Sequence, residues 1–291
     1  MTTSNSRACS RLRVWGHELD PKDLTSPEMR YLSTLPEPMP DVSWVWQEMN
    51  RVWREVGLDN TRPLKEQAEK VGCFYSHPIW LVNGLFTAAD RQSAGHRTAI
   101  ALHLTTLKPE TVADYGGGFG ELALTIARHN PDSRVTVVEP YPSRVGLSRL
   151  AGVAQIDVQP DLSRGPYDVV LAQDVLEHVD DPIALAHDLA RSVRKGGHLI
   201  VANCFHPMID CHLPQTFHLR YTFDHVMRRM GLVSCGKVPG APNARVFQVN
   251  QTPAFTKARA AERVSRAGLG QALNALGATV WRLQQALARQ P

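Results

Sequence analysis

The middle of the chain alternates between two kinds of segment, and this alternation restricts the fold more than any other feature. Between about residues 110 and 250, short β-rich runs are separated by stretches with helical periodicity. Such alternation is typical of a parallel sheet that is covered by helices. The expected parallel strands are 111–114, 134–139, 154–158, 168–172 and 198–203, and the expected helices between them are 121–129, 142–150 with a proline in its first turn, and 182–193, which stops at Gly196-Gly197.

The pattern changes after the fifth strand. A helix is expected at 222–230, followed by an antiparallel pair at 232–237 and 245–249. The predicted fold class is therefore α/β: a seven-stranded, mostly parallel, doubly wound sheet with helices on both faces, a helical N-terminal cap and a C-terminal amphipathic helix. The predicted domains are a helical, tryptophan-rich cap or substrate region at 1–108, a core at 109–252 and a basic amphipathic tail at 253–291.

The N-terminal region carries much of the chain's aromatic surface, since five of the six tryptophans lie before residue 108. Within it, Asp41 is expected to cap a helix whose apolar residues recur every three or four positions until Gly57 ends it. Residues 75–80 combine flat apolar faces with polar tips, which suits a sugar or polyketide-like ring. This region is therefore a candidate to contact such a ring.

Composition excludes several classes of protein. The 291 residues are 43% hydrophobic and 21% charged, which is enough for a packed core. No apolar run reaches the roughly 18 to 20 residues of a membrane span, and the start has no apolar segment typical of a signal peptide. The five cysteines are scattered without a Cys-x-x-Cys pair, so we expect neither a disulfide framework nor a zinc ribbon. These features favour a cytoplasmic protein.

The formal net charge is +4, and its distribution argues against nucleic acid as a partner. Residues 255–291 carry six basic side chains and one acid, a net of +5. The preceding 254 residues are therefore nearly neutral, at −1. A protein that grips phosphate backbones normally spreads basic charge over a folded face. A small molecule is the expected partner.

A glycine-rich loop joins the first core strand to the helix after it. It reads Asp114-Tyr115-Gly116-Gly117-Gly118-Phe119-Gly120-Glu121. Glycines at 116, 118 and 120 allow a sharp turn and the close approach of a ligand to main-chain atoms. A dinucleotide fingerprint counted from Gly116 would need its third glycine at position 121, where the chain has Glu121. The loop therefore does not match a dinucleotide site.

Two acids accompany this loop. Asp114 ends the first core strand, where it would repel a pyrophosphate and attract a ligand with an ammonium and a sulfonium group. Glu139 ends the second strand and is placed to accept two hydrogen bonds from ribose hydroxyls. Together they indicate a positively charged nucleoside ligand.

These motifs resemble, in the same order, those of the class I, Rossmann-like S-adenosylmethionine-dependent methyltransferases, particularly the small-molecule branch. The resemblance runs from about residue 109 to 249, roughly half of the chain. It rests on the Asp-x-Gly-x-Gly-x-Gly loop at 114–120, the ribose acid Glu139, the fourth strand at 167–170, the segment with Val-Leu-Glu-His at 173–179 and the Lys-x-Gly-Gly-like turn at 194–199.

The resemblance implies that S-adenosylmethionine is the cofactor. The cofactor-binding residues that it implies are Asp114, Gly116, Gly118, Gly120, Glu139 and Gln173. An acid after the third strand is expected to contact adenine, and Asp157 is preferred there over Asp161. A loop or capping role is an equal alternative for either aspartate.

Methyl transfer from a sulfonium is an in-line displacement, so the protein supplies proximity, alignment and, for a hydroxyl acceptor, a base. Histidine is the natural base near neutral pH. Those expected at the carboxyl ends of the fourth and fifth strands are His178, His206 and His212, each with a structural role as the alternative. His206, Asp210 and His212 could also hold a metal, but no further ligand stands at a diagnostic spacing, so no metal is expected.

The expected function is transfer of a methyl group to a small polar acceptor, with O-methylation of a sugar, glycan or secondary metabolite preferred. One alternative is N- or C-methylation, including that of tRNA. Another is an inactive methyltransferase-like adaptor that acts through its C-terminal helix. Loss of the glycine loop or of Glu139 would favour the adaptor, and both are present.

The tail has apolar residues at heptad spacing, namely Leu269, Leu273, Leu276, Val280, Leu283 and Leu287. Gly268, Gly270 and Gly277 each cost about 1 kcal/mol of helix propensity relative to alanine, so the helix should need a surface to dock on. That surface is the body of the protein, a second copy or protein partner, or an acidic membrane. Residues 262–290 are therefore a candidate interface for a homo-oligomer or a protein partner.

Overall fold

The structure is a computed structural model that describes residues 11–288. Its central sheet contains β3 (Thr111–Tyr115), β4 (Arg134–Val138), β5 (Ile156–Gln159), β6 (Tyr167–Gln173), β7 (Val193–Ala202), β8 (Val233–Val238) and β9 (Ala241–Gln248). The strand order is β5-β4-β3-β6-β7-β9-β8. The strands from β5 to β7 are parallel, and β9 runs antiparallel to both of its neighbours. The predicted α/β class with a seven-stranded, mostly parallel sheet is confirmed.

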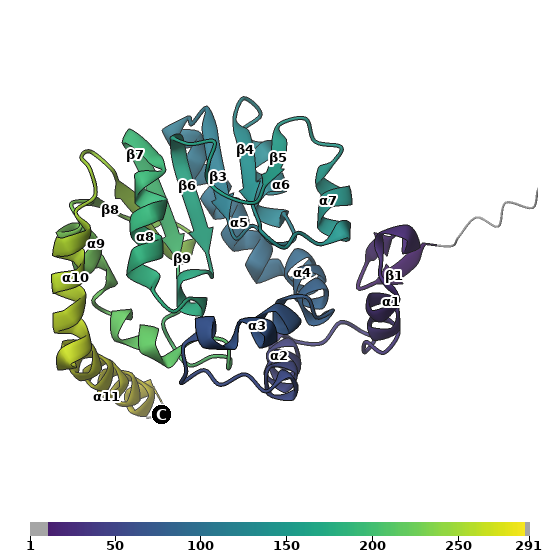
Figure 1. Cartoon of the computed structure of the whole chain (residues 1–291), viewed down its shortest axis with the longest axis horizontal. Coiled ribbons are helices and arrows are strands. Elements are labelled where there is room, and N and C mark those ends of the chain that lie inside the picture. Colours follow the sequence, from purple (N-terminus) through teal and green to yellow (C-terminus); the bar gives the residue numbers. More distant parts are fainter. Residues whose placement is uncertain (1–10, 289–291) are drawn as a thin grey trace, which may run out of the picture.

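Helices cover both faces of this sheet (Figure 1). One face carries α5 (Arg91–Leu107), α6 (Glu121–His129) and α7 (Arg144–Leu150), and the other carries α8 (Pro182–Arg191), α9 (Phe223–Arg229) and α10 (Phe255–Val264). Neighbouring residues of a strand point to opposite faces, so Val169 joins one apolar core and Val170 the other. Both are almost completely buried, as expected for a parallel strand covered on both sides.

The described part of the N-terminal region begins with a small hairpin of β1 (Leu12–Val14) and β2 (His17–Leu19), which the sequence did not predict. The elements that follow are the 3₁₀ turn η1 (Pro21–Asp23), α1 (Ser26–Leu32), α2 (Val42–Val56), η2 (Leu64–Gln67), α3 (Ala68–Tyr75) and α4 (Ile79–Ala89). Helix α2 has the predicted ends, because Asp41 accepts hydrogen bonds from the Ser43 and Trp44 N–H groups and Gly57 is left-handed at φ 75°.

Two acids tie this region to the carboxyl end of the sheet. Asp210, in the loop after β7, pairs with Arg54 of α2 at 2.9 Å. Asp180, in the loop that leads to α8, accepts hydrogen bonds from the backbone N–H groups of Leu64 and Lys65 at 2.8 and 3.0 Å. Figure 1 shows α2 and α3 below the sheet, at the end where these loops lie. The N-terminal helices therefore border the edge at which open α/β sheets bind ligands.

Two predicted helix ends are wrong. Helix α7 begins at Arg144 instead of residue 142, because Ser143 is its N-cap and accepts a hydrogen bond from the Gly146 N–H at 3.0 Å. Helix α8 ends at Arg191, and Gly196-Gly197 lies within β7. Gly197 fits tightly there, since a Cβ would lie 2.5 Å from the Asp168 carbonyl oxygen. The two glycines therefore serve a bulge between strands, where the β6–β7 register shifts, instead of a helix end.

The tail is not one continuous helix. After α10 come the π-helical segment η5 (Ser265–Leu269), with Gly268 at φ 140°, and α11 (Gly270–Ala288). Gly270 and Gly277 pack directly against His218 and Tyr221, where a Cβ would collide, and Asn274 donates to the Phe217 carbonyl at 3.0 Å. The glycines are therefore the points at which the helix approaches the 3₁₀ segment η4 (Pro214–Leu219) and its neighbour Tyr221.

Three residues of the predicted apolar seam do not pack against the body of the protein. Leu276 is 60% exposed, and Leu269 and Val280 are also exposed, as is Trp281 beside them. The side chains of Leu283 and Leu287 lie outside the described residues. None of the helices between residues 11 and 288 combines the length and apolarity that a membrane span requires.

A buried acid anchors the start of the tail. The Glu262 side chain is 4% exposed and pairs with Arg259 and with Arg266, and His218 Nε2 lies 3.6 Å from it. Although burial opposes ionisation, the nearby His218 ring and the hydrogen bonds from Arg259 and Arg266 lower the pKa of Glu262 to about 2. The ionised carboxylate thus stabilises the contact between α10 and η4.

We expect Glu262→Gln to lower the free energy of unfolding by about 1 to 2 kcal/mol at pH 7, because it removes the buried carboxylate that pairs with the partly exposed Arg259 and Arg266. The native pKa lies below the ordinary value of 4.5, so this stabilisation is present above pH 4.5 and is lost as the pH falls towards 2. Urea unfolding at pH 7 and pH 3.5 should therefore show a smaller difference at the lower pH. The control is Glu66→Gln, which breaks only an exposed pair with Arg62; an equal loss in both variants would contradict the assignment.

Candidate active site

The glycine loop folds the chain over the carboxyl end of β3. Gly116, Gly118 and Gly120 have φ values of 72°, 49° and 82°, which residues with a Cβ rarely adopt. A Cβ at Gly116 would lie 2.7 Å from Val175 Cγ2, and one at Gly120 would lie 2.8 Å from Leu150 Cδ2, whereas Gly118 faces open space. Two of the glycines thus permit close packing, and Gly118 leaves main-chain atoms open to a ligand.

Glu139 follows β4, and the main chain holds its carboxylate in place. Oε2 accepts a hydrogen bond from the Gly118 N–H at 3.1 Å, and Oε1 accepts one from the Tyr141 N–H at 3.0 Å. Each oxygen keeps a further lone pair, so the half-buried carboxylate can accept two more hydrogen bonds from neighbouring hydroxyls. The contribution of Tyr141 was missed because it comes from the backbone and not from the side chain.

Asp114 lies under the loop and not on its surface. It is 2% exposed, and Oδ2 has no hydrogen-bond partner within the described part of the chain. Burial, and secondarily the charge of Glu139, raises the pKa of Asp114 to about 7. A cation above the loop would favour the ionised form, so Asp114 can attract a positively charged ligand from beneath the loop.

The two candidate adenine acids occupy different places. Asp157 is the second residue of β5, where its carboxylate pairs with Arg164 and accepts a hydrogen bond from Gln159 Nε2 at 2.7 Å. Asp161 follows the strand and accepts a hydrogen bond from the Ser163 N–H at 2.8 Å. Ligands bind beyond the carboxyl ends of parallel strands, so this placement favours Asp161 and not the preferred Asp157.

The end of β6 contains a constrained residue that the sequence reasoning missed. Gln173 is the last strand residue, and Asp174 follows it in the left-handed region at φ 54°. Gln173 Nε2 donates to Asp174 Oδ2 at 3.2 Å, and the Asp174 N–H donates to the Ala202 carbonyl at 2.8 Å. A left-handed residue other than glycine is uncommon and often marks a functional site. No pattern in the sequence shows this conformation.

His178 and His212 meet beneath the loop that follows β7. His178 belongs to the short 3₁₀ turn η3 (Leu176–His178), and the two ring centroids are 4.8 Å apart. Nδ1 of His178 lies 2.9 Å from the Cys211 carbonyl, and Nδ1 of His212 lies 2.8 Å from the His206 carbonyl. Burial lowers the pKa of His178 to about 3 and also lowers the pKa of His212. Both rings are therefore neutral near pH 7.

The predicted cluster of His206, Asp210 and His212 does not form. Asp210 turns towards Arg54, and the Asn50 side chain accepts its backbone N–H at 2.7 Å. The acid that joins His178 and His212 is Glu177, and the ligand atoms of these three residues lie within 4.8 Å of one another. Sequence spacing could not indicate this, because 34 residues separate His178 from His212.

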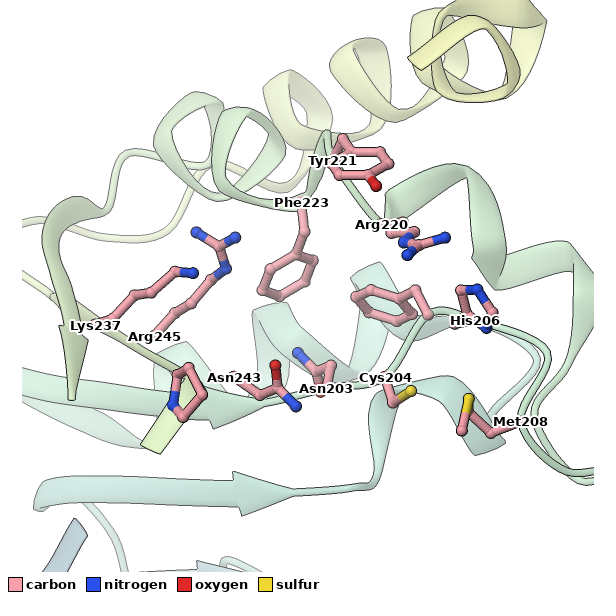
Figure 2. Close-up of a pocket in the computed structure, with 12 residues that line it drawn as sticks. Asn203, Cys204, His206, Met208, Arg220, Tyr221, Phe223, Lys237, Asn243 and Arg245 are labelled. Atoms are coloured by element: carbon pink, nitrogen blue, oxygen red, sulfur yellow. The ribbon is translucent and has the colours of Figure 1, made fainter. Parts of the chain in front are cut away.

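A cleft of about 410 Å³ opens beside the carboxyl end of β7 (Figure 2). His206 lines it, and the Nδ1 atom of this residue is buried without a partner among residues 11–288. Burial, and secondarily Arg220, lowers the pKa of His206. The lining residues are Asn203, Cys204, Phe205, His206, Met208, Arg220, Tyr221, Phe223, Lys237, Pro242, Asn243 and Arg245.

The predicted histidines therefore face different spaces. His206 lines the cleft of about 410 Å³. His212 lines a separate cavity of about 120 Å³, which is also lined by Asn60 and Asp210. Strands of one sheet are about 4.8 Å apart, and β7 is two strands from β3. The cleft therefore begins roughly 10 Å from the glycine loop, at the same edge of the sheet.

Comparison with known proteins assigns the family. A family model described as a methyltransferase domain matches residues 89–282, about two thirds of the chain. The chain is 29% identical over 128 residues to a ubiquinone biosynthesis O-methyltransferase of Erwinia tasmaniensis, covering 40% of this chain and 52% of that protein. It is 34% identical over 101 residues to the protein of the same name from Xanthomonas oryzae pv. oryzae, covering 31% and 41%. The chain thus spans about half the length of the curated relatives it matches.

Solved structures match this chain with lower sequence identity. Human N-acetylserotonin methyltransferase, in complex with S-adenosylmethionine, is 18% identical, with 77% of this chain and 70% of that one covered and a TM-score of 0.48. An O-methyltransferase family protein of Burkholderia thailandensis is 14% identical, with 81% and 78% covered and a TM-score of 0.47. Because the family model matches more than half of its length, the chain belongs to the class I S-adenosylmethionine-dependent methyltransferases.

Proposed function

We propose that this chain transfers a methyl group from S-adenosylmethionine to a hydroxyl group of a small polar molecule, such as a sugar, a glycan unit or a secondary metabolite. The observation that carries the proposal is the cleft lined by the neutral imidazole of His206, which opens at the same sheet edge as the loop–Glu139 cradle. The names of the curated relatives support a hydroxyl as the acceptor.

The residues at the glycine loop fit the cofactor. Glu139 would hold the ribose hydroxyls, and the open face of Gly118 would let the nucleoside approach the main chain. The unpartnered oxygen of Asp114 beneath the loop favours the positive charge of the cofactor's methionine portion. We propose that Asp161 contacts adenine and that Gln173 borders the methionine portion. When bound, S-adenosylmethionine supplies a methyl group on a positively charged sulfur.

The cleft residues would hold and activate the acceptor. His206 can accept a proton, because its lowered pKa leaves the ring neutral at pH 7. Asn203 also lines the cleft, and its side-chain amide can form a hydrogen bond with the same hydroxyl. These two groups would orient the oxygen and remove its proton. His178 and His212, with Nδ1 at backbone carbonyls, would support the loop that carries His206.

We also propose that the described part of the N-terminal region, residues 11–108, is a cap over the site. Tyr75 and Trp80 stack at 4.9 Å between ring centroids. Burial chiefly raises the pKa of Tyr75, so its phenol is uncharged near pH 7. These contacts favour a cap that excludes water from the reacting groups.

Two measurements test the proposal. Calorimetry with S-adenosylhomocysteine should show binding, and absence of binding would leave only the adaptor hypothesis. Sugar nucleotides and hydroxylated metabolites should then be screened for formation of S-adenosylhomocysteine. Mass spectrometry of the product locates the new methyl group, and a methylated nitrogen or carbon, or a methylated tRNA, would replace the proposed O-methylation.

The exposed face of α11 supports a further part of the proposal, namely contact with a second copy of the chain or a protein partner through residues 262–290. We expect Leu276→Glu with Val280→Glu to lower the mass measured by light scattering or to abolish partner binding, since both side chains are exposed and apolar. Thr279→Glu is the matched control on the same helix. An unchanged monomeric mass with no partner bound would limit α11 to its contact with η4 and Tyr221.

A further inference from the structure

The cleft beside β7 has an uneven distribution of charge. Arg220, Lys237 and Arg245 line it, and no aspartate or glutamate is among its lining residues. This contrasts with residues 1–254 as a whole, whose formal charge is −1. A concave surface whose charged side chains are all positive attracts anions from solution.

The cations differ in how far neighbouring acids neutralise them. Arg245 pairs with Asp224 at 2.5 Å, so much of its charge is compensated. Within residues 11–288, Lys237 has no carboxylate partner. Arg220 lies over the Tyr221 ring at 5.1 Å, and it too has no carboxylate partner in that range. Two of the three cations are therefore available to a ligand.

The two ends of the cleft differ from its middle. Figure 2 shows Lys237 and Arg245 on one side of the Phe223 ring, and Arg220 and His206 on the other. Phe223 and Phe205 form a buried aromatic floor, with ring centroids 5.4 Å apart. A ligand that spans the cleft therefore meets a cationic end, an apolar middle and an end that contains His206 and Arg220.

We propose that the cleft selects acceptors with an anionic group, a carboxylate or a phosphate, which binds at the unpaired ammonium of Lys237, while an apolar portion lies on Phe205 and Phe223. The hydroxyl to be methylated then lies at the opposite end, beside His206. This inference rests on the proposed function, because it treats the cleft as the acceptor site. It adds that the acceptor is an anion and not a neutral sugar, and it gives the direction in which the acceptor binds.

Small aromatic probes test this on the whole chain saturated with S-adenosylhomocysteine. Phenyl phosphate, phenylacetate and benzyl alcohol share a ring and differ in the charged group, and the first two distinguish a phosphate from a carboxylate. We expect at least one anion to bind about tenfold more tightly than benzyl alcohol in calorimetry at low salt. This preference should shrink at about 0.5 M salt, because the cleft is open to solvent.

Lys237→Met should reduce the preference roughly fivefold to tenfold, since it removes a charged hydrogen bond, and should leave benzyl alcohol unchanged. Lys237→Glu should favour benzylamine over phenyl phosphate. The control is Lys195→Met, because Lys195 is also an exposed lysine but lies near the amino end of β7, away from the cleft. Equal binding of charged and neutral probes, or equal effects of Lys195→Met and Lys237→Met, would overturn the inference.

The experiment separates this inference from the proposed function. If the protein binds S-adenosylhomocysteine but shows no preference for anionic probes, only the anionic acceptor is refuted. Anion binding that depends on Lys237 in a protein that does not bind S-adenosylhomocysteine would refute the methyltransferase activity and leave the anion site standing. S-adenosylhomocysteine is therefore titrated first, and the aromatic probes are then titrated both with and without it.

Discussion

Replacing His206 with alanine should lower turnover by about two to four orders of magnitude and leave the dissociation constant of S-adenosylhomocysteine unchanged. The reason is that His206 is the predicted histidine that lines the 410 Å³ cleft, and its Nδ1 has no partner in the described residues. General base catalysis by a positioned side chain contributes a factor of this size. Single-turnover kinetics at saturating cofactor would separate loss of chemistry from loss of binding.

The pH dependence gives a second readout of the same residue. The base must be neutral, and burial together with Arg220 lowers the pKa of His206 below its ordinary value of 6.5. The kcat/KM of the wild type should therefore be constant above about pH 6.5 and fall at lower pH as the ring is protonated. His225→Ala is the control, because His225 is exposed on α9, outside the cleft. Full activity of His206→Ala at all pH values would exclude His206 and favour an amine or carbon acceptor.

His178 and His212 need a different control, since both are mostly packed inside the loop structure. Nδ1 of each lies at a backbone carbonyl, so alanine variants should mainly lower the melting temperature. A large loss of turnover in His212→Ala without loss of stability would instead transfer the role of base to His212. Its position at the smaller cavity makes this a clear alternative.

The sheet could be predicted from sequence because its signals are local. Each parallel strand is a short apolar run between polar or glycine residues, and burial on both faces makes such runs conspicuous. Asp41 and Gly57 could be assigned as helix ends for the same reason, since caps depend on residues within one turn. Helix α7 shows the limit, because Ser143 and Pro142 are both acceptable starting residues and only the hydrogen bond to Gly146 decides between them.

The candidate site was predictable only in part. The glycine loop and Glu139 are adjacent to strand ends, so their meeting at one sheet edge follows from the parallel topology. Asp210 could not be assigned, because its partner Arg54 is 156 residues away in a helix whose position depends on tertiary packing. Tail glycines were interpreted as a cost to helix propensity, whereas Gly270 and Gly277 allow α11 to approach His218 and Tyr221. Propensity describes the isolated helix and cannot indicate such contacts.

Substitution of Glu139 should cause a large loss of cofactor binding. Glu139→Ala should weaken binding of S-adenosylhomocysteine roughly 30-fold to 150-fold, which corresponds to about 2 to 3 kcal/mol, because two charge-assisted hydrogen bonds to the ribose are lost. The main chain already holds the carboxylate through Gly118 and Tyr141, so little ordering opposes these bonds when the ligand arrives. Calorimetry at one salt concentration measures the change.

Glu139 also accepts a hydrogen bond from Gly118, so its removal could change the shape of the glycine loop, and control variants are needed. Glu139→Gln keeps one acceptor oxygen and removes the charge, so its binding loss should be smaller than that of Glu139→Ala, provided that the ribose is the partner. Glu110→Ala removes an exposed acid at the opposite end of β3 and should leave binding unchanged. Binding of adenosine alone, which has the ribose but no methionine portion, should weaken by a similar factor in Glu139→Ala. If adenosine binding were unaffected while S-adenosylhomocysteine binding fell, Glu139 would act on the methionine portion and the ribose assignment would be wrong.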